Sequence, residues 1–416
     1  MNRQNLAELL MRSLGEDRLR LLHLVRDEAR QRNLPLYIVG GAVRDLIMGR
    51  PVHDFDLTVE GDAIALARAL AKTYGGGVTV HLKFGTAKWF LPQDLKTDHD
   101  TLDLITVRSE TYQHPAALPT VAFGTIEDDL RRRDFTINAM AIRLDGTHFG
   151  ELRDDFHGRD DLQNGIVRVL HPGSFIDDPT RMYRAVRYAG RYEFRIAEDT
   201  LQRIPEARSL VERLSAQRIR HELDLILDEP DAVSMLKHLD ELDLLTCIHP
   251  ALGNFSQSKL AALTSPDPAL QTRNSRWALW LMHLSDQEIE FINDRLHFNS
   301  DLLKILRSIA LLETNLSAVE GLKPSEAVDV LEGYSFKALE VVSAALPDGE
   351  IKNILSLYLS EWWHIKPKTT GHDLKKLGIP PGPKYTEILH RLRAAWLDGD
   401  VKTEQEEKIL LSNLLR

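Results

Sequence analysis

The sequence of 416 residues has a single cysteine, Cys247. One thiol cannot close an internal disulfide and has no CxxC partner for zinc, which excludes a disulfide-stabilised or zinc-ribbon fold and suits a reducing compartment. The sequence also lacks any run of about 18 uncharged apolar residues, and its N-terminus lacks the apolar core of a signal peptide. We therefore expect a cytoplasmic protein with no membrane-spanning segment.

An excess of basic residues is lacking as well, since the net charge is −10 at pH 7. An acidic chain is a poor candidate for a nonspecific nucleic-acid coat. The local balance differs, because residues 179–220 contain no lysine but ten arginines against five acids. This local positive charge predicts a place where RNA or phosphate could bind. The arginines stand at positions 181, 184, 187, 191, 195, 203, 208, 213, 218 and 220.

Strands are missing from the second part of the chain, where the pattern from residue 179 to residue 416 is helical and no strand is expected beyond His171. The chain up to His171 mixes both patterns after a helical lead-in, and the prolines within 108–121 indicate an irregular connector. The sequence therefore predicts an α+β protein, with a mixed α/β head followed by an all-helical remainder. The expected strands are 36–39, a second one reaching Val59, 78–80, 86–91, 101–107, one after the helix that begins at Ile126, 149–153 and 166–170.

Residues 36–59 organise the expected head. The pattern predicts a strand over 36–39, a turn at the glycine pair 40–41, a helix over 42–48 and then the second strand. A helix that begins just after a glycine turn presents unpaired backbone N–H groups, which favour a bound phosphate.

The second strand carries Asp54 and Asp56 on one face, because side chains alternate along a strand and Phe55 points the other way. Two carboxylates on one face, the glycine turn and Arg44 together indicate a Mg²⁺–triphosphate site. An isolated Asp-x-Asp is more often turn chemistry, but the Gly-Gly-x-Val-Arg-Asp that precedes it favours the metal site. Asp103 lies on a Leu-Asp-Leu-Ile strand where burial favours an apolar residue, so it is the candidate third carboxylate.

Three motifs follow one another along the chain: Gly-Gly-Ala-Val-Arg-Asp at 40–45 with Asp-Phe-Asp at 54–56, Arg-Arg-Asp-Phe-Thr-Ile-Asn-Ala-Met-Ala at 132–141, and Asp-Asp-Pro-Thr-Arg-Met-Tyr-Arg-Ala-Val-Arg at 177–187. In order and spacing they resemble the class II tRNA nucleotidyltransferases. These are the CCA-adding enzymes with their CC-adding, A-adding and bacterial poly(A) polymerase relatives, within the DNA polymerase β-like superfamily. Residues 370–383 resemble a tail motif of the same family, whereas 240–365 carry little signature.

The resemblance implies a polymerase β-like nucleotidyltransferase head, a small mixed sheet with helices, followed by an all-helical neck, body and tail. The implied boundaries are an N-terminal helical lead-in at 1–35, the head at 36–172, a base-reading neck at 173–240, the body at 241–365 and the tail at 366–416. It also implies that Asp54, Asp56 and Asp103 are catalytic and bind Mg²⁺. The positions implied to bind the nucleotide within the head are Gly40, Gly41, Arg44, Asp45 and Arg133.

Asp178, Arg181, Arg184 and Arg187 recur every three residues, and such a stripe on a helix is by default a solvated face. The resemblance implies instead that Asp178 and Arg181 read the Watson–Crick edge of C or A, and that the two later arginines reach phosphate or stabilise this pair. A carboxylate accepts from an exocyclic amine, and a guanidinium donates to a ring nitrogen or a carbonyl. Asp177 stands where relatives usually have glutamate.

The implied function is Mg²⁺-dependent transfer of nucleotides from CTP and ATP to the tRNA 3′ end without a nucleic-acid template, while the helical remainder contacts the acceptor arm. Relatives commonly carry an Asp-Gly-Arg-Arg-Pro-like loop after the third carboxylate, whereas this chain has Tyr-Gln-His-Pro-Ala-Ala-Leu-Pro at 112–119. This departure leaves open whether the full CCA, only CC or only the terminal A is added.

Two further alternatives remain. A poly(A) polymerase is less favoured than a tRNA-specific enzyme. Poly(A) polymerases usually carry a basic C-terminal extension, whereas this chain ends in an acidic and then apolar stretch. An inactive RNA-binding homologue is the alternative from another class, and the intact Asp54, Asp56 and Arg44 argue against it. The oligomeric state is left open.

Overall fold

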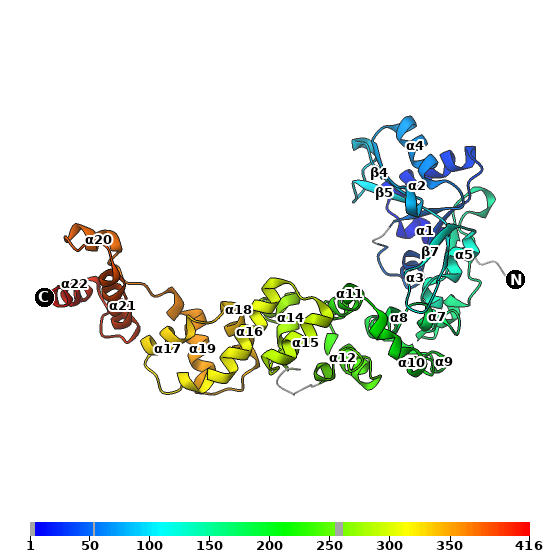
Figure 1. Cartoon of the computed structure of the whole chain (residues 1–416). Helices are drawn as coiled ribbons and strands as arrows, with labels where there is room; N and C mark the ends of the chain where they lie inside the picture. Colours follow the sequence, from blue (N-terminus) through cyan, green and yellow to red (C-terminus); the bar gives the residue numbers. More distant parts are fainter. Residues whose placement is uncertain (1–4, 53–54, 254–260) are drawn as a thin grey trace. The chain divides into compact units, whose positions relative to one another are not determined.

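The computed structural model describes residues 5–52, 55–253 and 261–416 (Figure 1). These residues form two compact units, one of Met1–Glu222 with Glu241–Cys247 and one of Leu223–Asp240 with Ile248–Arg416. The first unit contains the strands, and the second is helical throughout its described part. The predicted α+β class, a mixed head followed by helices, is therefore confirmed. The finer division into lead-in, head, neck, body and tail stays a prediction.

A seven-stranded mixed sheet forms the centre of the first unit, in the order β3-β4-β5-β2-β1-β8-β9. Its middle strand is β2, which pairs antiparallel with β1 and parallel with β5, while β1 also pairs antiparallel with β8. The strands are β1 (Leu36–Val39), β2 (Leu57–Val59), β3 (Gly77–His81), β4 (Thr86–Phe90), β5 (Thr101–Thr106), β8 (Ala141–Arg143) and β9 (Leu152–Arg153). Each predicted strand of the head has a counterpart, with ends that differ by a few residues.

Alternation explains how the sheet buries one face. In β5, Leu102 and Leu104 are buried, whereas Asp103 between them is half-exposed. The helix α4 (Ala63–Tyr74) covers this side of the sheet with its alanine and leucine face, and its N-cap Asp62 accepts a hydrogen bond from the Ala65 N–H at 2.9 Å. The pattern thus leaves the Asp103 carboxyl on the opposite face, away from the core.

The remaining helices of the first unit surround this sheet and continue beyond it. They are α1 (Ala7–Ser13), α2 (Glu16–Gln31), α3 (Gly41–Ile47), α5 (Ile126–Arg131), α6 (Gly158–Gln163), α7 (Ser174–Asp177), α8 (Thr180–Tyr192), α9 (Glu198–Leu201) and α10 (Ile204–Ala207), with α11 (Ala216–Leu227) at the boundary of the units. Short 3₁₀ turns, among them η3 (Thr136–Asn138) and η5 (Arg208–Arg213), connect them.

The expectation of an irregular connector over 108–121 was wrong at both ends. Strands β6 (Arg108–Thr111) and β7 (Thr120–Phe123) form an antiparallel hairpin, with Arg108 opposite Phe123. The prolines that suggested irregularity lie in the connection 112–119, where their missing N–H groups remove no ladder hydrogen bond.

The expectation of no strand beyond His171 was also wrong, by one short element. Strand β11 (Arg195–Ile196) pairs parallel with β10 (Ile166–Val167). A strand of two residues has too few positions to show alternation, so the sequence gave no signal for β11, whereas β10 lies within the expected strand 166–170.

The second unit packs helix on helix. Its helices are α12 (Ala232–Glu241), α14 (Arg273–Leu281), α15 (Asp286–Leu296), α16 (Ser300–Asn315), α17 (Pro324–Leu331), α18 (Phe336–Ala345), α19 (Glu350–Ser360), α20 (Gly371–Lys376), α21 (Pro383–Leu397) and α22 (Glu404–Leu414). Capping boxes start α15, α20 and α22, and prolines occupy the first turns of α17 and α21, as helix starts favour. Among the described residues, no helix is long and apolar enough to cross a membrane.

Gly158 tests the packing between α6 and the turn η3. A Cβ at this position would lie 2.1 Å from the Thr136 carbonyl oxygen, which is backbone and cannot rotate away. We expect Gly158→Ala to lower the free energy of unfolding by about 1–3 kcal/mol, as overpacking does. Gly77→Ala is the control, because its Cβ would meet only the Phe90 ring at 3.9 Å. Equal unfolding midpoints of Gly158→Ala and Gly77→Ala in chemical denaturation would contradict the close approach of Gly158 to the Thr136 carbonyl.

Candidate active site

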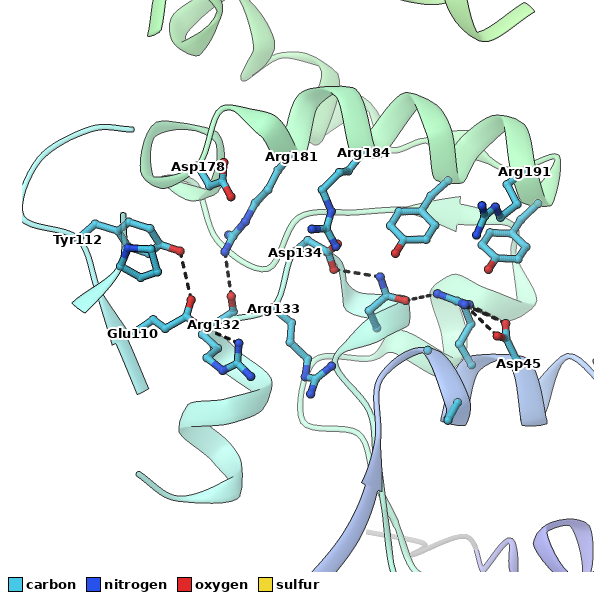
Figure 2. A pocket seen from close by; sticks show the side chains of 17 residues that line it. Asp45, Glu110, Tyr112, Arg132, Arg133, Asp134, Asp178, Arg181, Arg184 and Arg191 are labelled. Atoms are coloured by element: carbon cyan, nitrogen blue, oxygen red, sulfur yellow. Dashed lines mark hydrogen bonds and ion pairs between the residues drawn. The ribbon is translucent and has the colours of Figure 1, made fainter. Parts of the chain in front are cut away.

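A polar pocket with a cavity volume of about 560 Å³ opens in the first unit, between α3, the β6–β7 hairpin, the segment after α5 and the helix α8 (Figure 2). Seven of the nine residues predicted to bind nucleotide line it: Gly41, Arg44, Asp45, Arg133, Asp178, Arg181 and Arg184. Gly40 and Arg187 are not among the lining residues. The structure therefore brings three distant motifs to one place.

The glycine turn forms one end of the pocket. Gly40 has φ +71°, a backbone conformation that suits glycine, and a Cβ there would lie 2.2 Å from Arg133 Nη1. Helix α3 begins at Gly41. The absence of a side chain at Gly40 thus allows Arg133 to approach the start of the helix closely.

Arg44 is held in one position at this end of the pocket. It is 5% exposed and donates to both carboxylate oxygens of Asp45, at 3.0 and 3.1 Å, and to Asn138 Oδ1 at 2.5 Å. Its guanidinium also lies 4.7 Å from the centre of the Tyr192 ring, a cation–π contact. Asp45, predicted to bind nucleotide, is in this structure the residue that orients Arg44.

Arg133 is held by a buried acid. Its Nη2 donates to Asp129 Oδ2 at 2.9 Å, and Arg132 donates to the other oxygen of the same carboxylate. Burial alone would raise the pKa of Asp129, but the two guanidinium groups outweigh it and lower this pKa below its ordinary value. Asp129 therefore stays ionised and fixes both arginines.

A continuous set of polar contacts joins α8 to α3. Arg184 Nη2 donates to Asp134 Oδ2 at 2.5 Å, and Asn138 Nδ2 donates to Asp134 Oδ1 at 2.9 Å. Asn138 in turn accepts from Arg44, so the two ends of the pocket are connected (Figure 2). Burial opposes the charge on Asp134, yet Arg184 lowers its pKa, and the carboxylate raises the pKa of Arg184. Sequence reasoning quoted this motif but gave Asp134 and Asn138 no role.

Asp178 and Arg181 line the other end. Asp178 precedes α8 in extended backbone, because Pro179 separates it from the helix, so the predicted helical stripe begins only at Arg181. Arg181 is buried and donates to Ser174 Oγ at 2.7 Å and to the Arg132 carbonyl oxygen at 2.8 Å. Figure 2 shows Arg181 pointing from α8 toward Arg132.

Arg187 has a different environment. It is 6% exposed, lies 3.4 Å from Glu222 and stacks over the Tyr188 ring at 5.2 Å. It is positioned to support α8 and not to line the pocket, which leaves its predicted stabilising role open.

Of the predicted acids that the structure describes, only Asp103 lies on a strand, and the expectation that the second strand carries Asp56 was wrong by one residue. Asp54 falls outside the described residues. Asp56 directly precedes β2 and Asp103 lies on β5, and the parallel register pairs Leu57 with Leu104 one residue later in each strand. The two acids line one cavity of about 190 Å³. Lys88 on β4 lies 3.1 Å from Asp103 Oδ2.

Several lining residues were missed by sequence reasoning. Glu110 and Tyr112 come from β6 and the loop after it, a stretch interpreted as irregular, so nothing singled them out. Burial raises the pKa of Tyr112 to about 12, and its hydroxyl donates to Glu110 at 3.3 Å. Tyr188 and Tyr192 continue the spacing of Arg184 along α8, and this periodicity could have identified them.

A mixed sheet with one acid on a strand and another directly before the adjacent strand, a glycine turn at a helix start and an arginine-lined pocket define a nucleotidyltransferase head. Comparison with known proteins agrees. Residues 36–168 match the family profile "Poly A polymerase head domain", and residues 193–255 match "Probable RNA and SrmB- binding site of polymerase A".

Related proteins extend this match over the whole chain. An "A-adding tRNA nucleotidyltransferase" of Halalkalibacterium halodurans is 35% identical, covering 97% of this chain and 94% of the relative. A "CCA-adding enzyme" of Ligilactobacillus salivarius is 28% identical over 94% of each. The solved Thermotoga maritima CCA-adding enzyme complexed with tRNA has a TM-score of 0.81 and 28% identity, covering 100% of both chains. The chain belongs to the tRNA nucleotidyltransferase family, which confirms the resemblance seen in its motifs.

Gly40→Ala tests the close approach of Arg133 to the start of α3. The new Cβ would displace the guanidinium, so we expect the Kd for a nucleoside triphosphate to rise about tenfold or more. Gly49→Ala is the matched control, because Gly49 has a similar φ of +67° but no heavy atom of the described residues within 4 Å of its Cβ. Titration calorimetry with ATP and CTP measures both variants. If Gly40→Ala and Gly49→Ala bind ATP and CTP with equal affinity, Gly40 has no role in nucleotide binding.

Proposed function

We propose that the protein transfers nucleotides from CTP and ATP to the tRNA 3′ end, with Mg²⁺ and without a nucleic-acid template. One observation carries this proposal: a single pocket is lined by Gly41, Arg44 and Arg133 and also by Asp178 and Arg181, and the Arg184–Asp134–Asn138 contacts join its walls. The names of its relatives, A-adding and CCA-adding, support the same reaction.

The triphosphate end consists of the α3 start, Arg44 and Arg133. Backbone N–H groups at Gly41 and two fixed guanidinium groups suit the charge of a triphosphate. The 3′-hydroxyl oxygen of tRNA bonds to the α-phosphorus as the bond to the β-phosphate breaks, and pyrophosphate leaves. Arg44 and Arg133 would hold this leaving group, and no covalent enzyme intermediate is needed.

The acids suit a hard cation. Asp56 and Asp103, with Asp54, would offer carboxylate oxygens, the ligands that Mg²⁺ prefers. When bound, Mg²⁺ supplies charge neutralisation and lowers the pKa of the attacking hydroxyl. The Lys88 ammonium, which lies beside Asp103, would add its positive charge to that of the bound Mg²⁺.

The base end explains a preference for C and A. Both bases carry an exocyclic amine, which the Asp178 carboxylate can accept from, while the Arg181 guanidinium can donate to the neighbouring ring nitrogen or carbonyl. Arg181 is already fixed by Ser174 and by the Arg132 carbonyl, so it presents its donors without reorganisation.

A specialist that adds only the terminal A is the second candidate. The 35% identical relative over nearly the whole chain is an A-adding enzyme, and the 112–119 loop lacks the Asp-Gly-Arg-Arg-Pro-like sequence of common CCA-adding members. We further propose that neck, body and tail, over 173–416, contact the tRNA acceptor arm by shape and phosphate. The cytoplasmic location stays a prediction.

An incorporation assay separates these candidates. Transcripts of one tRNA that end before CCA, after C and after CC are each incubated with labelled CTP or ATP and Mg²⁺. A CCA-adding enzyme extends all three, whereas an A-adding specialist extends only the transcript ending in CC. Absence of incorporation on every transcript would refute the proposed function.

Asp103→Asn tests the acid pair. The substitution keeps the size but removes the charge, and we expect the incorporation rate to fall roughly 100-fold or more while the Kd for tRNA is unchanged. Asp94→Asn, at an exposed position on the turn after β4, is the control. Chelation with EDTA should reproduce the loss in the wild type and be reversed by added Mg²⁺. Full activity of Asp103→Asn would rule this residue out as a metal ligand.

A further inference from the structure

Arg218, near the start of α11, reaches two parts of the pocket wall at once. Its Nη2 donates to Asp178 Oδ1 at 2.6 Å, and its Nη1 donates to the Ala116 carbonyl oxygen at 3.0 Å. Ala116 belongs to the loop 112–119, whose two ends, Tyr112 and Pro119, line the pocket. One guanidinium therefore ties the loop that departs from the family pattern to the aspartate at the base end.

The contacts of Asp178 divide its two oxygens. Oδ1 accepts from the Thr180 N–H at 2.9 Å, from the Thr180 hydroxyl at 2.6 Å and from Arg218. Oδ2 accepts no hydrogen bond from any described residue. Three donors on one oxygen fix the rotation of the carboxylate and leave the other oxygen available as an acceptor.

Ala116 is in an unusual conformation that needs support. Its φ of +63° is left-handed, which a residue with a Cβ rarely adopts, and it is 7% exposed. Its N–H donates to the Ile176 carbonyl oxygen at 3.1 Å, two residues before Asp178. The loop is thus attached on both sides to the segment that carries Asp178.

We propose that Arg218 is a positioning residue for base selection, which holds the Asp178 carboxylate and the 112–119 loop in one arrangement. The inference rests on the proposed function. A fixed Oδ2 accepts from the amine of C or A and repels the carbonyl that U and G carry at the corresponding position. A carboxylate free to rotate could instead accept from the ring N–H of U or G, so losing Arg218 reduces the discrimination between bases.

The test compares Arg218→Ala, Arg218→Lys and the control Arg213→Ala, whose exposed arginine ends η5. For each full-length protein, kcat/KM is measured for all four nucleoside triphosphates on the tRNA transcript that the wild type extends. We expect Arg218→Ala to reduce the ratio of correct to incorrect bases about tenfold or more. Arg218→Lys should give an intermediate ratio, because an ammonium keeps the charge but not the fork of two donors. Arg213→Ala should match the wild type.

A merely structural role would give a different result. If Arg218→Ala lowers kcat/KM equally for all four nucleotides, or changes nothing, the positioning role is overturned. If Arg218→Ala does not fold, judged by its thermal transition, the ratio for Arg218→Lys decides, and a wild-type ratio overturns the proposal. A wild type that incorporates no nucleotide at all instead refutes the proposed function.

Discussion

The arrangement of the pocket depends on the ion pair between the buried Asp134 carboxylate and the partly exposed Arg184 guanidinium. Removing Arg184 would destabilise this arrangement, since the buried Asp134 charge would lose its cationic partner. Arg184 comes from α8 and Asp134 from the segment after α5, so the pair joins two parts of the chain that are distant in sequence. Through Asn138 the same contacts reach Arg44, so they hold the proposed triphosphate end and the proposed base end at a fixed separation.

This fixed separation links the two proposed tasks of the pocket, which are binding of the triphosphate and selection of the base. A nucleotide that spans both ends has to satisfy them together, because neither wall can move without breaking a buried contact. A base that fits badly would shift the phosphates away from the glycine turn and the attacking hydroxyl. Small displacements of reacting atoms are costly, so selection of the base would act on the rate of transfer as well as on binding.

The sequence predicted much of the fold, because 36–39 is a short apolar run before a distinctive glycine turn and because apolar and polar residues alternate in 101–104. The motif residues that line the pocket were also identified, through the resemblance of the three motifs to those of the tRNA nucleotidyltransferases. What could not be predicted depends on contacts between distant segments. The β6–β7 hairpin was hidden by the prolines of its connection. The link from Arg218 to Asp178 joins residues 40 positions apart, one on α11 and the other in the extended segment before α8. The buried partners Asp134 and Asn138 gave no pattern beyond their motif.

The parallel pairing of β2 with β5 has a wider consequence. Between these strands the chain leaves the centre of the sheet, forms α4, β3 and β4 and then returns. The relative placement of Asp56 and Asp103 is fixed by the hydrogen-bonded ladder and not by the length of that excursion. Insertions or deletions within the excursion can therefore accumulate during evolution without moving the acids, provided that the ladder keeps its register.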